Sequence, residues 1–170
     1  MQQPSDQMMI DTVDQRDRVI GQIRRGNVLG SGHSFRVVHV FVFNKSNELL
    51  VQRIHPSRNR HPGYWGSSIA AYVFAGESYE EAARRRLEQE MGIVAPSLHL
   101  YGKTSMDDEK CIKHISLFIL NDFDGTITPD FTHISQAEWI PIPKLLQVLS
   151  QDSRKFAPTT RHLFRYYFGA

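Results

Sequence analysis

The sequence predicts an α/β fold in which a mixed β-sheet is flanked by helices. Three observations carry this prediction. The chain has 170 residues, a length that suits one hydrophobic core. Strand-like apolar runs recur from one end of the chain to the other, and a single well-capped helix interrupts them near the middle. Two further helical segments close the chain, and helices beside such strands pack on the faces of a sheet.

The composition narrows the class further. With 41% hydrophobic and 22% charged residues, the chain is neither collagen-like, a coiled coil nor wholly disordered. No apolar run approaches the ~20 residues of a membrane span, and the first residues lack a secretory pattern. Cys111 is the single cysteine, which excludes an internal disulfide and fits a reducing compartment. We therefore expect a cytoplasmic protein without a membrane segment.

The first part of the chain is predicted to consist mainly of strands. Residues 1–8 are polar and predicted to be disordered, which leaves 9–170 as a single domain. Apolar runs beside a polar turn predict a hairpin over 10–21. Residues 36–44 are apolar on both faces, as is typical of a central strand. The further strands expected here are 48–54 and 67–74.

The clearest helix is predicted over 78–91. Ser78 is a suitable N-cap, and Glu81 three residues later completes a capping box. Gly92 suits the position just beyond the last turn. The elements expected after it are strands over 98–105, 111–120 and 137–140, a helix ending near Leu149 and a last helix over 158–168.

The segment from Ala71 to Ile93 carries the strongest functional signal. It resembles the Nudix box, G-x5-E-x7-R-E-U-x-E-E-x-G-U, in which U is a bulky aliphatic residue, and the spacing is complete over 23 positions. The matching residues are Glu77, Arg85, Leu87, Glu90, Gly92 and Ile93. The resemblance implies a Nudix α/β/α sandwich for the single domain.

The box departs from the family pattern where the family does its chemistry. Positions 86, 89 and 90 share one helix face, where the family uses three glutamates to hold Mg²⁺ or Mn²⁺ against a diphosphate. Here Arg86 (+1), Gln89 (0) and Glu90 (−1) give a formal sum of 0 instead of −3. Arg86 and Glu90 are also spaced to pair with each other. The box therefore indicates the fold more firmly than the activity.

Other segments resemble the branch of Nudix proteins related to isopentenyl-diphosphate isomerase. They are the hairpin at Asp11–Gly21, Leu50–Arg53, His61–Trp65 and the Glu138-Trp139 pair. The resemblance covers roughly Ile10 to Leu146. True isomerases carry a cysteine on the strand after Trp65, and here Gly66–Ala71 contains none. We therefore expect no isomerase activity.

A basic loop supplies the second functional clue. Arg53, Arg58 and Arg60 have no acidic residue among them, and arginines offer paired donors to phosphate. With Arg86 and Trp65 they are the candidate substrate-binding residues. The alternatives are a solvated loop and a core role for the tryptophan. Whether this loop meets the acidic turn over 107–109 stays open.

The sequence alone assigns no role to three histidines. His33 and His39 lie before and within the predicted central strand, where a metal pair competes with ordinary packing or solvation. His114 faces the same alternatives.

Three functions from different classes follow from these residues. The first is an impaired hydrolase of a diphosphate linkage in a nucleoside diphosphate derivative or similar phosphoanhydride. It would use Glu90, Glu77 and Arg85 as catalytic residues and bind Mg²⁺ or Mn²⁺ through Glu90. The second is an inactive module that binds a phosphorylated small molecule through Arg86 and the Arg53–Arg60 loop. The third is a protein-interaction scaffold.

Several alternatives stay open beside these functions. One alternative gives purely structural roles to Glu77, Arg85 and Gly92, and makes Glu90 only an ion-pair partner of Arg86. The net charge of +2 gives no reason to expect specific nucleic-acid binding, and a homodimer is left open.

Overall fold

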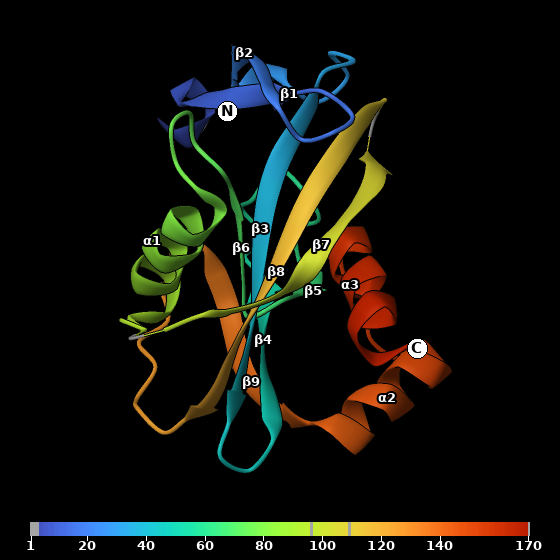
Figure 1. Cartoon of the computed structure of the whole chain (residues 1–170). Coiled ribbons are helices and arrows are strands. Elements are labelled where there is room, and N and C mark those ends of the chain that lie inside the picture. Colours follow the sequence, from blue (N-terminus) through green and yellow to red (C-terminus); the bar gives the residue numbers. More distant parts are fainter. Residues whose placement is uncertain (1–3, 96, 109, 170) are drawn as a thin grey trace.

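The structure is a computed structural model that describes residues 4–95, 97–108 and 110–169. A mixed nine-stranded sheet has helices on both faces, as the sequence predicts. Figure 1 shows α1 on one side of the sheet, α2 and α3 on the other, and the β1–β2 hairpin across one end. The strands are β1 (Met9–Val13), β2 (Val19–Arg24), β3 (Ser34–Asn44), β4 (Glu48–Ile54), β5 (Trp65–Gly66), β6 (Ile69–Tyr72), β7 (His99–Asp108), β8 (Cys111–Phe123) and β9 (Ile134–Pro141). The helices are α1 (Tyr79–Met91), α2 (Ile142–Gln151) and α3 (Pro158–Phe168), with 3-10 turns η1 (Pro4–Gln7) and η2 (Arg25–Asn27).

Strand β3 is central, as predicted from its apolar character. It runs parallel to β8 and antiparallel to β1 and β6. One face of β3, at Val38, Val40 and Val42, packs in a cluster with α1. The opposite face, at Phe41 and Phe43, joins a cluster with α2 and α3. Burial on both sides explains why the sequence of β3 lacks the alternation of a surface strand.

Helix α1 has the caps that the sequence predicts. The Ser78 hydroxyl accepts a hydrogen bond from the Glu81 N–H at 3.1 Å. Gly92 ends the helix with φ of 65°, in the left-handed region where a residue without a Cβ is favoured. Leu87 and Met91 are fully buried against the sheet. This anchoring fixes the face on which residues 86, 89 and 90 lie.

The two halves of the sheet diverge next to α1. β3 and β4 share one register pair, Phe43 with Leu49, and then separate. Beyond this pair β3 continues with β6 and β8, whereas β4 pairs with β5 and β9. The separation leaves side chains of both strands facing a common space.

Three details differ from the sequence prediction. Pro4–Gln7 form a 3-10 turn in a segment predicted to be disordered, and residues 1–3 lie outside the described residues. The expected strand over 67–74 is shorter and is preceded by the separate β5. Asp107 and Asp108 extend β7 instead of forming a turn, because Asp108 pairs with Cys111. None of the described helices is long and apolar enough to cross a membrane.

Candidate functional site

A cavity of about 990 Å³ opens where β3 and β4 separate. Its walls come from these two strands, from the second half of α1, from the 57–61 loop and from the start of α3. Six basic side chains line it: Arg25, Arg58, Arg60, Arg85, Arg86 and Lys113. The carboxylates on the same wall are Asp6, Glu90 and Asp130. The excess of cationic groups favours an anionic ligand.

The pair expected from the helix spacing is present at the cavity wall. Arg86 Nε lies 2.8 Å from Glu90 Oε1, and the Glu90 side chain is only 4% exposed. The Nε–H of Arg86 is not aligned for a hydrogen bond, so the contact is an ion pair. The carboxylate that would serve a metal is thus neutralised by a fixed cation.

The residues present do not fit a Mg²⁺ or Mn²⁺ site. These cations require several oxygen ligands, mostly carboxylates. Within the described ranges, no group of three His, Cys, Asp or Glu side chains is placed to hold a metal. Gln89 lines the cavity beside Glu90 but brings no charge. Metal binding through Glu90 therefore remains a prediction without support in the geometry.

Arg58 differs from the other basic side chains of the cavity in its lack of a partner among the described residues. Its side chain forms no hydrogen bond or ion pair with the described residues. Burial, chiefly, and then the nearby charges of Arg86 and Arg25 lower the pKa of its guanidinium, while Glu90 acts in the opposite direction. A half-buried cation among other cations gains most from an incoming anion.

Glu77 and Arg85 bond to each other and to the backbone of the box, and so stabilise its conformation. Arg85 donates two hydrogen bonds to the Glu77 carboxylate, at 2.9 and 3.1 Å, and a third to the Tyr72 carbonyl. Glu77 also accepts a bond from the Phe74 N–H at 2.8 Å. Arg85 touches the cavity, whereas Glu77 is not among its lining residues. These contacts match the architectural alternative for both residues.

The predicted basic loop divides into two parts. Arg58 and Arg60 line the cavity, but Arg53 is exposed and donates to the Gly63 carbonyl outside it. The Arg154 guanidinium carbon lies over the Trp65 ring, 4.3 Å from the ring centre. Trp65 also packs against the hydrophobic core. The structure therefore brings together Arg58, Arg60 and Arg86 but not Arg53 or Trp65.

The basic loop contacts the acidic segment at Asp108. Arg60 bonds to both carboxylate oxygens of Asp108, at 3.0 and 3.2 Å. The same carboxylate accepts a bond from Lys113 Nζ at 2.8 Å, and Lys113 also contacts the Thr159 hydroxyl. This network ties the basic loop to β8 and α3.

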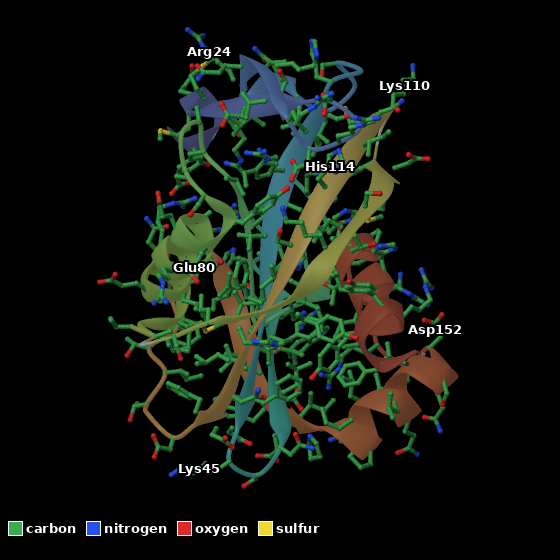
Figure 2. All side chains as sticks on the ribbon, in the orientation of Figure 1. Arg24, Lys45, Glu80, Lys110, His114 and Asp152 are labelled. Atoms are coloured by element: carbon green, nitrogen blue, oxygen red, sulfur yellow. The ribbon has the colours of Figure 1, made fainter. Side chains whose placement is uncertain are left out.

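The three histidines left open do not form a metal pair. His39 is buried and bonds through Nδ1 to the Ser67 hydroxyl at 2.8 Å. His33 is exposed ahead of β3. His114 lies on β8 below the hairpin (Figure 2), and its buried Nε2 has no hydrogen-bond partner in the described part of the chain.

Sequence reasoning missed several cavity residues. His133 Nδ1 lies 2.5 Å from Asp130 at the rim, where hydrogen bonds from Thr132 and then His133 lower the pKa of the Asp130 carboxyl to about 2. Arg25 and Lys113 come from a turn and a strand without a recognisable motif, and Gln52 comes from the Leu50–Arg53 segment, where the resemblance gives it no role. Their shared signal is a polar residue within or beside a strand, which becomes informative only once the strands are placed.

Comparisons with known proteins agree with this fold. The chain is 36% identical over 104 residues to an uncharacterised Nudix hydrolase of Pseudomonas aeruginosa, covering 61% of this chain and 62% of that one. It is 29% identical to an isopentenyl-diphosphate Δ-isomerase of Burkholderia multivorans, over 85% of this chain and 84% of the isomerase. The crystal structure of DR0079 from Deinococcus radiodurans superposes with a TM-score of 0.79 at 27% identity, covering 94% of this chain and 99% of that one.

The model of the NUDIX domain matches residues 33–160, which include the box, β3 and β4, and most of the cavity wall. Members of this family typically use a divalent metal. Because the match takes in most of the chain, this protein belongs to the Nudix family.

Proposed function

We propose that this protein binds a small molecule containing a diphosphate without help from a divalent metal, and that its hydrolytic activity is impaired. The single observation that carries the proposal is Arg86, a cation paired to Glu90 on the helix face where the family pattern has metal-binding glutamates. An arginine can meet phosphate oxygens directly, whereas a glutamate needs a metal between them.

The other cations support the same ligand. Arg58 has no partner in the described residues and lies close enough to Arg86 for their charges to interact. A diphosphate between these two guanidinium groups would relieve their repulsion. Arg60 lines the same cavity but is already held by Asp108, so we assign it the lesser role of orienting the loop.

Hydrolysis of a phosphoanhydride is the second candidate, favoured by membership of the family and by the retained Glu90. Its impairment follows from charge. A carboxylate already paired with Arg86 is a weak ligand for a cation. The two candidates differ in their need for a metal.

Titration calorimetry with inorganic pyrophosphate and with ADP-ribose tests the proposal. Each titration is made once in EDTA and once in excess Mg²⁺. We expect equal affinity in both, and a loss of about tenfold in Arg58→Gln, since hydrogen bonds to charged groups contribute about 1.5–3 kcal/mol.

Arg53→Gln is the matched control, because Arg53 belongs to the same loop but lies outside the cavity lining. It should leave both affinities unchanged. Binding only in the presence of Mg²⁺, or equal losses in Arg58→Gln and Arg53→Gln, would contradict the proposal. Hydrolysis in Mg²⁺, of pyrophosphate to phosphate or of ADP-ribose to AMP and ribose 5-phosphate, would favour the hydrolase instead.

A further inference from the structure

Part of the cavity wall carries no formal charge, although it is polar and almost completely buried. His39, Gln52, Ser67 and Thr160 line the cavity and are 5%, 6%, 2% and 1% exposed, respectively. They come from β3, β4, the link between β5 and β6, and the first turn of α3. Such groups can hydrogen-bond a polar ligand, whereas an apolar chain would leave them unpaired.

A chain of hydrogen bonds fixes the ring of His39. Its Nδ1 lies 2.8 Å from the Ser67 hydroxyl, which lies 3.2 Å from the Thr160 hydroxyl. The Ser67 N–H also donates to that Thr160 oxygen at 3.1 Å. No described residue bonds to Nε2, the other ring nitrogen of His39. The ring is thus held at one side, with one nitrogen left to a ligand.

Gln52 is held in the same manner. Its amide Nε2 donates to the Ser68 carbonyl at 3.1 Å, and no described group donates to its Oε1. Two buried polar side chains of the same cavity, one on β3 and one on β4, therefore each keep an unused hydrogen-bonding atom. Each such atom costs free energy unless a ligand or water satisfies it.

The imidazole of His39 is neutral at physiological pH. Burial, first, and the charge of Lys113, second, lower the pKa of His39 to about 3. Lys113 is itself paired with Asp108 at 2.8 Å. Although His39 contacts a serine, such a weak base does not activate a hydroxyl nucleophile. The pair is suited to binding, and a neutral ring with one free nitrogen pairs with a hydroxyl group.

We propose that His39 and Gln52 recognise an uncharged, hydroxyl-bearing group of the ligand, of the kind a sugar provides, and discriminate against diphosphates of apolar chains. The inference rests on the proposed function, since the arginines would hold the diphosphate while His39 and Gln52 bind the group attached to it. An apolar chain would leave both polar atoms buried and unpaired, which is the strongest basis for rejecting a ligand.

Calorimetry in EDTA with three probes tests this role. The probes are inorganic pyrophosphate, ADP-ribose and isopentenyl diphosphate, titrated into the wild-type chain, His39→Leu and His39→Gln. The wild type should bind ADP-ribose about tenfold or more tightly than isopentenyl diphosphate. His39→Leu should weaken ADP-ribose binding about tenfold and leave pyrophosphate binding unchanged, and His39→Gln should recover part of the loss.

The outcomes separate this inference from the proposed function. Normal pyrophosphate binding with equal ADP-ribose affinity in the wild type and His39→Leu would overturn the role of His39 alone. No binding of pyrophosphate or ADP-ribose to the wild type would overturn both. If His39→Leu does not fold, Thr160→Val removes the hydroxyl that holds Ser67 at nearly constant shape, and it should weaken ADP-ribose but not pyrophosphate.

Discussion

Two ion pairs of the Nudix box, Glu77–Arg85 and Arg86–Glu90, differ in the segments that they join and in their consequences. Glu77–Arg85 joins the loop before α1 to the helix through hydrogen bonds on both carboxylate oxygens. Arg86–Glu90 joins two residues of the same helix at the cavity wall. The first pair keeps family residues, whereas the second has an arginine where the family pattern has a glutamate.

The difference teaches that a motif can keep the residues that support its architecture while the residues that carry its chemistry are altered. The Glu77–Arg85 pair fixes the strand–loop–helix geometry, and that geometry is intact. The Arg86–Glu90 pair determines which charge faces the ligand, and there the sign of position 86 is reversed. The first pair therefore bears on the architecture of the box, and the second on the charge of the cavity wall.

The largest expected effect comes from breaking the architectural pair. Arg85→Gln leaves the 19%-exposed Glu77 carboxylate without its guanidinium, and loss of one partner of a largely buried pair destabilises by about 3 kcal/mol. Urea unfolding followed by circular dichroism measures the change. Lys45→Gln is the control, since Lys45 and Asp124 form an exposed ion pair at 2.8 Å, and such surface pairs contribute at most about 1 kcal/mol. Equal losses in the two variants would contradict the distinction.

Reversing the second pair should change the ligand chemistry but not the fold. The double variant Arg86→Glu, Gln89→Glu places three glutamates on the face that now sums to zero charge. We expect it to bind pyrophosphate about tenfold more tightly in Mg²⁺ than in EDTA, because three carboxylates can supply the oxygens that Mg²⁺ requires. Calorimetry measures both affinities. A variant that still binds equally well in EDTA would show that position 86 does not select the mode of binding.

The sequence could predict most of the fold for physical reasons visible in single segments. Residues 48–54 and 158–168 match β4 and α3 residue for residue, because turn residues or a proline mark their ends. The caps Ser78 and Gly92 act within a few residues of each other. Pro4–Gln7 could not be foreseen, because this turn packs against Arg25, which is distant in sequence.

The candidate site was predictable only where its residues share one helix. The i, i+4 spacing indicates the Arg86–Glu90 pair directly, and the structure contains it. The basic loop could not be divided in advance, because the sequence does not say that Arg58 turns inward and Arg53 outward. His39 is a sharper case, since its partner Ser67 lies 28 residues away along the chain, and Thr160, which bonds to Ser67, lies 93 residues beyond Ser67.

The smallest expected effect is on the pH dependence of the free energy of unfolding, and it comes from the buried side chain of His39. His39 is neutral when folded and protonates near pH 6.5 when unfolded. As pH falls below about 6.5 the unfolded chain takes up a proton that the folded chain refuses, so stability decreases with acidity down to about pH 3. Between pH 7 and pH 6 the loss attributable to His39 is about 0.7 kcal/mol.

His39→Gln removes the titrating group and keeps a neutral polar side chain, so urea midpoints of this variant should depend less steeply on pH than those of the wild type over this interval. His33→Gln is the matched control, because His33 is exposed and should leave the slope unchanged. Identical slopes in the wild type and His39→Gln would mean that His39 accepts a proton in the folded chain. A charged His39 ring would then favour phosphate in this part of the cavity. The proposed separation of roles, in which cations bind the phosphates and neutral groups bind a hydroxyl, would be wrong there.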